Sequence, residues 1–189
     1  MAISTNRSSH ATTGTTSNGW STAKIAVCAL FVAVAMITSF MEIPVPPVAW
    51  LKYDPSFAVC LVAGFAFGPG VGAVVGVLSW LPHLFMDPWG ALMSIVCGLA
   101  FVLPASLIYA KNRSAKGMGI GMVVSFVAVL VVSSLSNIVV TPLYTPTMTS
   151  ADVIALLVPA LLPFNAVKAA LNCAICAIAY KPLSKVLEK

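Results

Sequence analysis

The chain has 189 residues, of which 60% are hydrophobic and only 8% are charged, and its mean hydropathy is +1.01. Soluble domains carry about 25% charged residues, so this composition excludes a water-soluble globule and, beyond the N-terminus, a disordered chain. The apolar segments do not alternate between polar and apolar residues, as the strands of a membrane β-barrel would. What remains is an all-α integral membrane protein.

The chain begins with a polar segment, residues 1–22, that is rich in Ser, Thr, Gly and Asn and is predicted to be a disordered tail. The first apolar run, Ala23–Met41, is long enough to span a membrane and lacks the pattern of a cleaved signal peptide. The loop Glu42–Ser56 follows. Its three prolines, Pro44, Pro46 and Pro47, exclude helix and favour extended backbone, as expected of a stiff lid over an outward cavity.

Glycine and proline turns divide the middle of the chain. Asp54 is predicted to cap a second helix with Pro55 at its first position, and this helix has only about 13 residues before Gly68-Pro69-Gly70. A segment of that length does not distinguish a span from a re-entrant helix. A third helix with a kink at Pro82 and a fourth helix are predicted at residues 71–86 and 89–110.

The last third of the chain begins with the basic loop Lys111–Lys116 and a fifth helix predicted at residues 118–140. A loop is predicted at residues 141–146, and Thr149–Asp152 fits a capping box that opens the last helical region. Prolines at positions 159 and 163 are predicted to interrupt that region. The final span is therefore placed at residues 164–180, before a basic tail.

The positions of the charges support a single six-helix bundle over residues 23–181, with residues 1–22 and 182–189 as cytoplasmic tails. In this topology eight of the ten basic residues lie on the cytoplasmic side, where Glu188 is the only acid. The outer segments hold Lys52 against four acidic residues. Basic residues are enriched on the cytoplasmic side of membrane proteins, so both termini are predicted to be cytoplasmic, with the cell membrane as the location.

Lys168 is the one basic residue that this topology places inside a span. Because an ionisable residue there is costly, it marks a candidate site, although a lysine that extends to the outer interface remains the alternative. Asn165 and Asn172 share its helix face. Asn137 in the fifth helix lies at the same outer level, either as a ligand contact or as a hydrogen bond between helices.

These side chains favour a flat polar ligand. An asparagine offers a donor beside an acceptor, which matches the imide or amide edge of a heterocycle, and a lysine adds a donor for a carbonyl oxygen. Aromatic residues near the same level are expected either to stack on such a ligand or to form an ordinary interfacial belt. They are Trp50, Tyr53, Trp89, Tyr144 and Phe164.

Two other patterns point to different roles. Ala29 and Ala33 form a small-xxx-small pair, which lets another helix approach closely, whether for internal packing or for a partner. Ser79, His83 and Asp87 are spaced like a catalytic set, but Pro82 interrupts their helix and no nucleophile elbow accompanies them. An intramembrane hydrolase that uses Ser79 and His83 is the less favoured class, and the sequence carries no metal or nucleotide motif.

Several stretches resemble the S components of energy-coupling factor (ECF) vitamin transporters, most closely the riboflavin-specific branch. Together they cover nearly the whole chain after Lys24. They are Leu51-Lys-Tyr-Asp-Pro-Ser56, Ala63-Gly-Phe-Ala-Phe-Gly-Pro69, Gly90-Ala-Leu-Met93, Asn137 with Pro142-Leu-Tyr144, Phe164-Asn-Ala-Val-Lys168 and Tyr180-Lys-Pro-Leu-Ser184. The Phe-Asn-x-x-Lys stretch is the most specific of them for the flavin branch.

The resemblance implies a subunit that is not itself an enzyme, needs no cofactor, and binds its vitamin from outside under the first loop. It would work with a transmembrane scaffold subunit and two ATPase subunits, and Ala29 and Ala33 would contact the scaffold. The resemblance places the flavin ring against Asn137, Asn165 and Lys168, and Lys52, Tyr53 and Trp89 are further candidates for the site. The chain departs from the family at Ser79–His83, where many riboflavin members carry a Lys-Asn pair. Another vitamin or a flavin analogue is therefore the alternative ligand.

Overall fold

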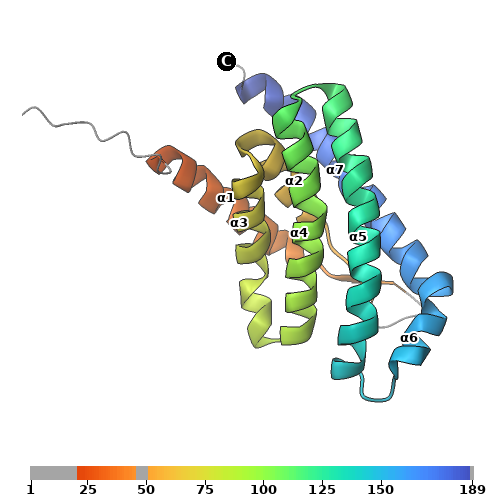
Figure 1. Ribbon diagram of the computed structural model, residues 1–189. Coiled ribbons are helices and arrows are strands. Elements are labelled where there is room, and N and C mark those ends of the chain that lie inside the picture. Colours follow the sequence, from red (N-terminus) through yellow and green to blue (C-terminus); the bar gives the residue numbers. More distant parts are fainter. Residues whose placement is uncertain (1–20, 46–50, 188–189) are drawn as a thin grey trace, which may run out of the picture.

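Helices make up nearly all of the secondary structure in residues 21–45 and 51–187, the parts of the chain that the computed structural model describes (Figure 1). The first helix, α1, covers Thr22–Ser39, and Ser21 caps it by accepting a hydrogen bond from the Lys24 backbone N–H at 3.3 Å. All but two residues of the predicted disordered tail, 1–22, lie outside the described residues.

A short β-hairpin occupies the described part of the predicted lid loop. Strand β1, Ile43–Pro44, pairs antiparallel with β2, Lys52–Tyr53, in a register that places Ile43 opposite Tyr53. The Val45 N–H extends the pairing by donating to the Leu51 carbonyl at 2.8 Å. Residues 46–50, which include Pro46, Pro47 and Trp50 of the sequence predictions, lie outside the described residues.

Helices α2, Ser56–Phe67, and α3, Pro69–Trp80, form a tight antiparallel pair. Gly68 joins them with φ of +96°, a conformation that only glycine adopts easily. Their backbones approach so closely that a Cβ added at Gly72 would lie 2.8 Å from the Gly64 Cα. The predicted cap shifts by one residue: Pro55 is the N-cap of α2, and the Asp54 carboxylate accepts the Ser56 N–H from outside the helix at 3.1 Å.

Several prolines in the middle of the chain lie inside helical segments and do not end them. The predicted kink at Pro82 is a 3₁₀ turn, η1, at Leu81–Phe85. Helix α4, Pro88–Lys111, starts at the Asp87 cap and runs through Pro104. Helix α5, Ala115–Tyr144, also continues through Pro142, where a loop was predicted, because the loss of one backbone donor leaves the neighbouring bonds intact, including that from the Thr145 N–H to the Thr141 carbonyl.

The last helical region starts as the sequence predicts and then runs on without a break. Thr149 and Asp152 form the predicted capping box of α6, Ser150–Leu156. Pro159 lies in a π-helical turn, η2, at Leu157–Leu161, and Pro163 follows as the second residue of α7, Leu162–Leu187. The irregular turn accommodates the N–H groups that the two prolines lack, so the helical region continues. Helix α7 therefore begins earlier and ends later than the span predicted at residues 164–180.

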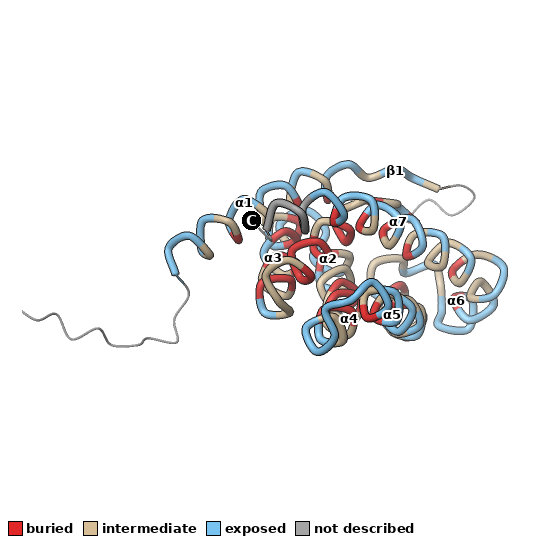
Figure 2. Tube along the Cα trace, turned by 90° about the horizontal axis from the view of Figure 1, so that it is seen from above, coloured by how far each residue is buried: buried red, intermediate tan, exposed pale blue. Residues whose placement is uncertain are grey.

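The helices run between two ends of the bundle (Figure 1). One end holds the turn at Gly68, the basic loop between α4 and α5, and the end of α7, whereas η1, the start of α4 and α6 lie at the other. Seen from above, buried residues line the facing sides of the helices and exposed residues face outward (Figure 2). Many of the outward residues are large and apolar, such as Val123, Val127 and Val131 of α5, as a lipid-facing surface requires.

Four helical segments of the described chain are long and apolar enough to cross a membrane, namely Thr22–Ser39, Pro88–Lys111, Ala115–Tyr144 and Ser150–Pro182. Two further apolar helices, Ser56–Phe67 and Pro69–Phe85, are shorter. The helical membrane fold is therefore as predicted, while the count of six spans and the cytoplasmic termini stay predictions.

Candidate functional site

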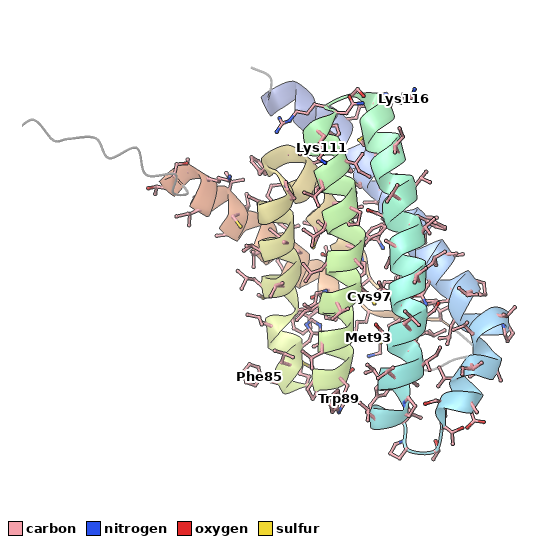
Figure 3. All side chains as sticks on the ribbon, viewed as in Figure 1. Phe85, Trp89, Met93, Cys97, Lys111 and Lys116 are labelled. Carbon is pink, nitrogen blue, oxygen red and sulfur yellow. The ribbon has the colours of Figure 1, made fainter. Side chains whose placement is uncertain are left out.

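A cavity of about 820 Å³ lies in the end of the bundle away from the basic loop. Its size falls in the range of small-molecule sites, roughly 300–1,000 Å³. Its walls come from the residue that caps the end of α1, the β-hairpin, the start of α2, the α3–η1 junction, the first part of α4, the second half of α5 and the start of α7. Figure 3 shows Trp89, Met93 and Cys97, which line it, along α4, with Lys111 and Lys116 at the opposite end.

Lys168 reaches the cavity wall from α7 and is held there by three groups. Its ammonium group lies 2.7 Å from the Asp54 carboxylate, donates to the Lys52 carbonyl at 3.2 Å, and lies 5.2 Å from the centre of the Phe57 ring. Asp54 is only 2% exposed. A charge pair of this geometry points the ammonium group in one direction, so it presents a fixed hydrogen-bond donor to the cavity.

The two predicted asparagines line the same cavity. The Asn165 amide donates to the Leu161 carbonyl at 2.8 Å, one turn earlier in the helical region. The buried Asn137 amide donates to the Ser133 carbonyl at 2.7 Å, and its oxygen accepts from the Thr141 hydroxyl at 3.3 Å. Because each carboxamide has two N–H groups and two lone pairs, both side chains are oriented by their own helix and retain a donor and an acceptor.

Asn172, the third member of the polar face on α7, has a different place. It is fully buried and does not line the cavity. Its oxygen accepts the Ala58 N–H at 2.9 Å, and its amide donates to the Lys168 carbonyl at 2.9 Å and contacts the Asp54 carbonyl at 3.4 Å. Asn172 therefore joins α7 to the first turn of α2, next to the Lys168–Asp54 pair.

The other predicted site residues divide between two places. Lys52, in an ion pair with Glu42, and Trp89 line the main cavity. Tyr53 instead faces a second, largely apolar cavity of about 470 Å³ between the hairpin and η2–α7. Burial first, and then the Asp54 charge, raise the pKa of the Tyr53 hydroxyl, so this side chain stays neutral.

The structure adds Asp54 and Phe57 to the site, which the sequence analysis did not place there. A lysine in a membrane span needs a counter-charge, and the chain has only five acidic residues. Asp54, which stands next to an apolar helix, could therefore have been predicted as the partner of Lys168. Phe57 could not have been predicted in this way, since it is one of nine phenylalanines in an apolar sequence.

The alternative catalytic set is not assembled. The Ser79 hydroxyl donates to the Gly76 carbonyl of its own helix at 3.2 Å, and the Asp87 carboxylate caps α4. Neither ring nitrogen of His83 has a hydrogen-bond partner among the described residues. The serine is therefore not activated by the histidine, as a hydrolase would require.

Ala29 and Ala33 are exposed on α1, the helix whose first half extends beyond the bundle (Figure 1). The two small side chains lie one helical turn apart, beside Leu30 and Val34, which are also exposed.

A sequence model of the family described as the substrate-specific component of ECF transporters matches residues 23–180. The riboflavin transporter RibU of Staphylococcus aureus (strain TCH60) is 30% identical over 166 residues, which cover 83% of this chain and 88% of that protein. The riboflavin transporter FmnP of Bacillus subtilis (strain 168) is 26% identical over 158 residues, covering 77% of this chain and 83% of that protein.

A solved structure, described as the S component of a bacterial ECF transporter, has a similar fold. The TM-score is 0.75 at 27% sequence identity, and the match covers 87% of this chain and 97% of the other.

Proposed function

Because the chain belongs to the family of substrate-specific components of ECF transporters, we propose that it binds riboflavin in the 820 Å³ cavity and takes it up from outside the cell. It is a membrane transport subunit, not an enzyme. The observation that carries the proposal is the convergence of Asn137, Asn165 and Lys168 on one cavity, in a chain whose relatives are riboflavin transporters.

The chemistry of the cavity fits a flavin ring. The edge of that ring alternates carbonyl oxygens with ring nitrogens, and the two carboxamides and the ammonium group offer the complementary donors and acceptors. Trp89, Phe57 and Phe164 add flat apolar walls to the same cavity. In this proposal the β-hairpin with Lys52 closes the outer side, as a lid.

The proposed orientation places the cavity toward the outside and both termini in the cytoplasm of the cell. The cavity lies at the end of the bundle opposite Lys111 and Lys116 (Figure 3), and basic residues favour the cytoplasmic side. Uptake then needs a transmembrane scaffold subunit and two ATPase subunits to reorient the protein. The exposed Ala29–Ala33 pair of α1 is the proposed contact with the scaffold.

Titration of the purified protein with riboflavin in detergent tests the proposal. We expect stoichiometric binding with quenched flavin fluorescence, because aromatic side chains line the cavity. Thiamine and biotin, at the same concentrations, serve as vitamin controls and should not bind. Failure to bind any flavin would refute the proposal, and binding of a control vitamin instead would identify a different substrate.

A further inference from the structure

Two side chains on the α3–η1 side of the cavity carry nitrogens that no hydrogen bond of the described residues uses. Trp80 and His83 are each 5% exposed and line the main cavity. The Trp80 Nε1 and both His83 ring nitrogens are covered and have no hydrogen-bond partner among the described residues. Nearly all buried polar groups in proteins are paired, so unpaired nitrogens at the wall of a binding cavity indicate a partner that arrives with the ligand.

Aromatic contacts hold the His83 ring in position, but its nitrogens have no hydrogen-bond partner among the described residues. Its ring stacks on Phe40 with centroids 4.2 Å apart and lies 4.5 Å from the Trp80 ring. Neither contact is a hydrogen bond, so the Trp80 Nε1 and both imidazole nitrogens stay unpaired among the described residues. Phe40, whose ring stacks on the imidazole, is itself 48% exposed.

The charges on this side favour a neutral ligand group. Glu42 and Asp87 also line the cavity, and the Asp87 carboxylate accepts the Gly90 N–H at 3.0 Å at the start of α4. Glu42 is paired with Lys52, and the other lining cation, Lys168, is paired with Asp54, which leaves Asp87 with no cation pairing it among the described residues. The negative charge of the Asp87 carboxylate would repel a phosphate, whereas it would not repel a neutral hydroxyl.

A hydroxyl also suits the nitrogens chemically. A neutral imidazole has one donor and one acceptor, and an indole has only a donor. A hydroxyl donates and accepts, so it satisfies the imidazole in either tautomer. Several hydroxyls in a row match a wall with three nitrogens better than a single acceptor such as a carbonyl oxygen.

We propose that Trp80 and His83 form a subsite for the hydroxyl-bearing chain of the ligand, on the side of the cavity away from the α5 and α7 residues that hold its ring. Figures 1 and 2 show α3 and α5 on opposite sides of α4. The inference rests on the proposed function, because the polyol chain in question is that of riboflavin.

Ligands that differ only in the chain provide the test. Lumiflavin has the flavin ring with a methyl group in place of the polyol chain, and FMN carries a terminal phosphate on that chain. His83→Phe removes both nitrogens but keeps a ring that stacks on Phe40. We expect it to weaken riboflavin binding about tenfold and lumiflavin binding less than twofold, because one hydrogen bond is lost with the first ligand only.

Trp80→Phe is the second variant, and it should show the same difference between the ligands if His83→Phe does not fold. Met93→Leu, an apolar change in the same cavity, is the matched control and should affect both ligands equally. Equal effects of His83→Phe on riboflavin and lumiflavin would overturn the inference, as would FMN binding to the unaltered protein as tightly as riboflavin. If that protein binds neither riboflavin nor lumiflavin, the proposed function fails instead.

Discussion

Lys168 and Asp54 neutralise each other, and either charge alone is costly to bury. Replacing one of them should therefore destabilise the protein more than replacing both. Lys168→Met leaves the Asp54 carboxylate, 2% exposed, without its counter-charge. We expect a loss of about 3–5 kcal/mol in the free energy of unfolding, measured by thermal or denaturant unfolding in detergent. Adding Asp54→Asn should recover most of this loss, because the amide is neutral and its oxygen still accepts from the Ser56 N–H.

The double variant also isolates the role of Lys168 in binding. Without the ammonium group the ligand loses a charged donor, which is worth about 1.5–3 kcal/mol. We expect riboflavin affinity to fall by roughly 10- to 100-fold in a folded Lys168→Met/Asp54→Asn protein, as measured by fluorescence titration. Unchanged affinity in this protein would remove Lys168 from the site, whatever the single variant does.

The sequence predicted the polar residues of the cavity better than its walls. Lys168, Asn137 and Asn165 stand out because polar groups are rare in membrane helices, and topology alone brings them to one level. Asp54 did not stand out, since a Pro follows it and a capping role explained it equally well. Its contact with Lys168 joins residues 114 positions apart, and no local pattern encodes such a contact.

At the scale of elements, α7 carries one asparagine that supports the fold, Asn172, and one that lines the cavity, Asn165. The Asn172 side-chain oxygen accepts the Ala58 N–H at 2.9 Å, one of the first donors of α2, which also donates to the Pro55 carbonyl at 3.1 Å. Asn172→Leu would remove this bond and the contact with the Asp54 carbonyl, which together join α7 to the start of α2. We expect a loss of about 1–3 kcal/mol in the free energy of unfolding, seen as a lower Tm.

Asn165→Leu is the matched comparison on α7. Its amide bonds only to the Leu161 carbonyl, in the same continuous helical region, so stability should change little, while riboflavin affinity falls. The reverse pattern, a stable Asn172→Leu protein and an unstable Asn165→Leu protein, would contradict this division of roles.

The contact between α2 and α3 depends on the absence of a side chain. A Cβ at Gly72 would lie 2.7 Å from a Val102 methyl group and 2.8 Å from the Gly64 Cα, and backbone cannot move aside cheaply. Gly72→Ala is therefore expected to destabilise the protein by about 1–3 kcal/mol, measured by unfolding in detergent. Gly70→Ala on the same helix has open space around the new Cβ and should change stability by less than about 0.5 kcal/mol.

Helix starts were easier to predict than helix ends. Asp87 and Thr149 are side-chain caps, and such caps act locally, so the sequence shows them directly. Pro142 lies inside α5 where a loop was predicted, and α7 runs on past the predicted end of the last span, through Pro182. In a membrane helix neighbouring groups compensate for the one donor that a proline lacks, so the helix continues through it.

For the whole molecule, the distribution of charge predicts which end faces which side of the membrane. Asn112 lies in the basic loop after α4, and Thr147 lies between α5 and α6 at the cavity end; both are exposed. Because a span separates them, six spans with cytoplasmic termini place Asn112 inside and Thr147 outside the cell. The native cysteines, four buried and one half-buried, would be replaced by serine or alanine to give a clean background.

Intact cells that express Asn112→Cys or Thr147→Cys can then be treated with a membrane-impermeant maleimide. We expect labelling of the Thr147→Cys protein only, and of the Asn112→Cys protein only after the cells are broken. Labelling in the opposite order would mean that the orientation is reversed and that the cavity faces the cytoplasm. That orientation is incompatible with capture of a vitamin from outside. Labelling of both sites in intact cells would mean that α5 does not cross the membrane, and the six-span count would then be wrong.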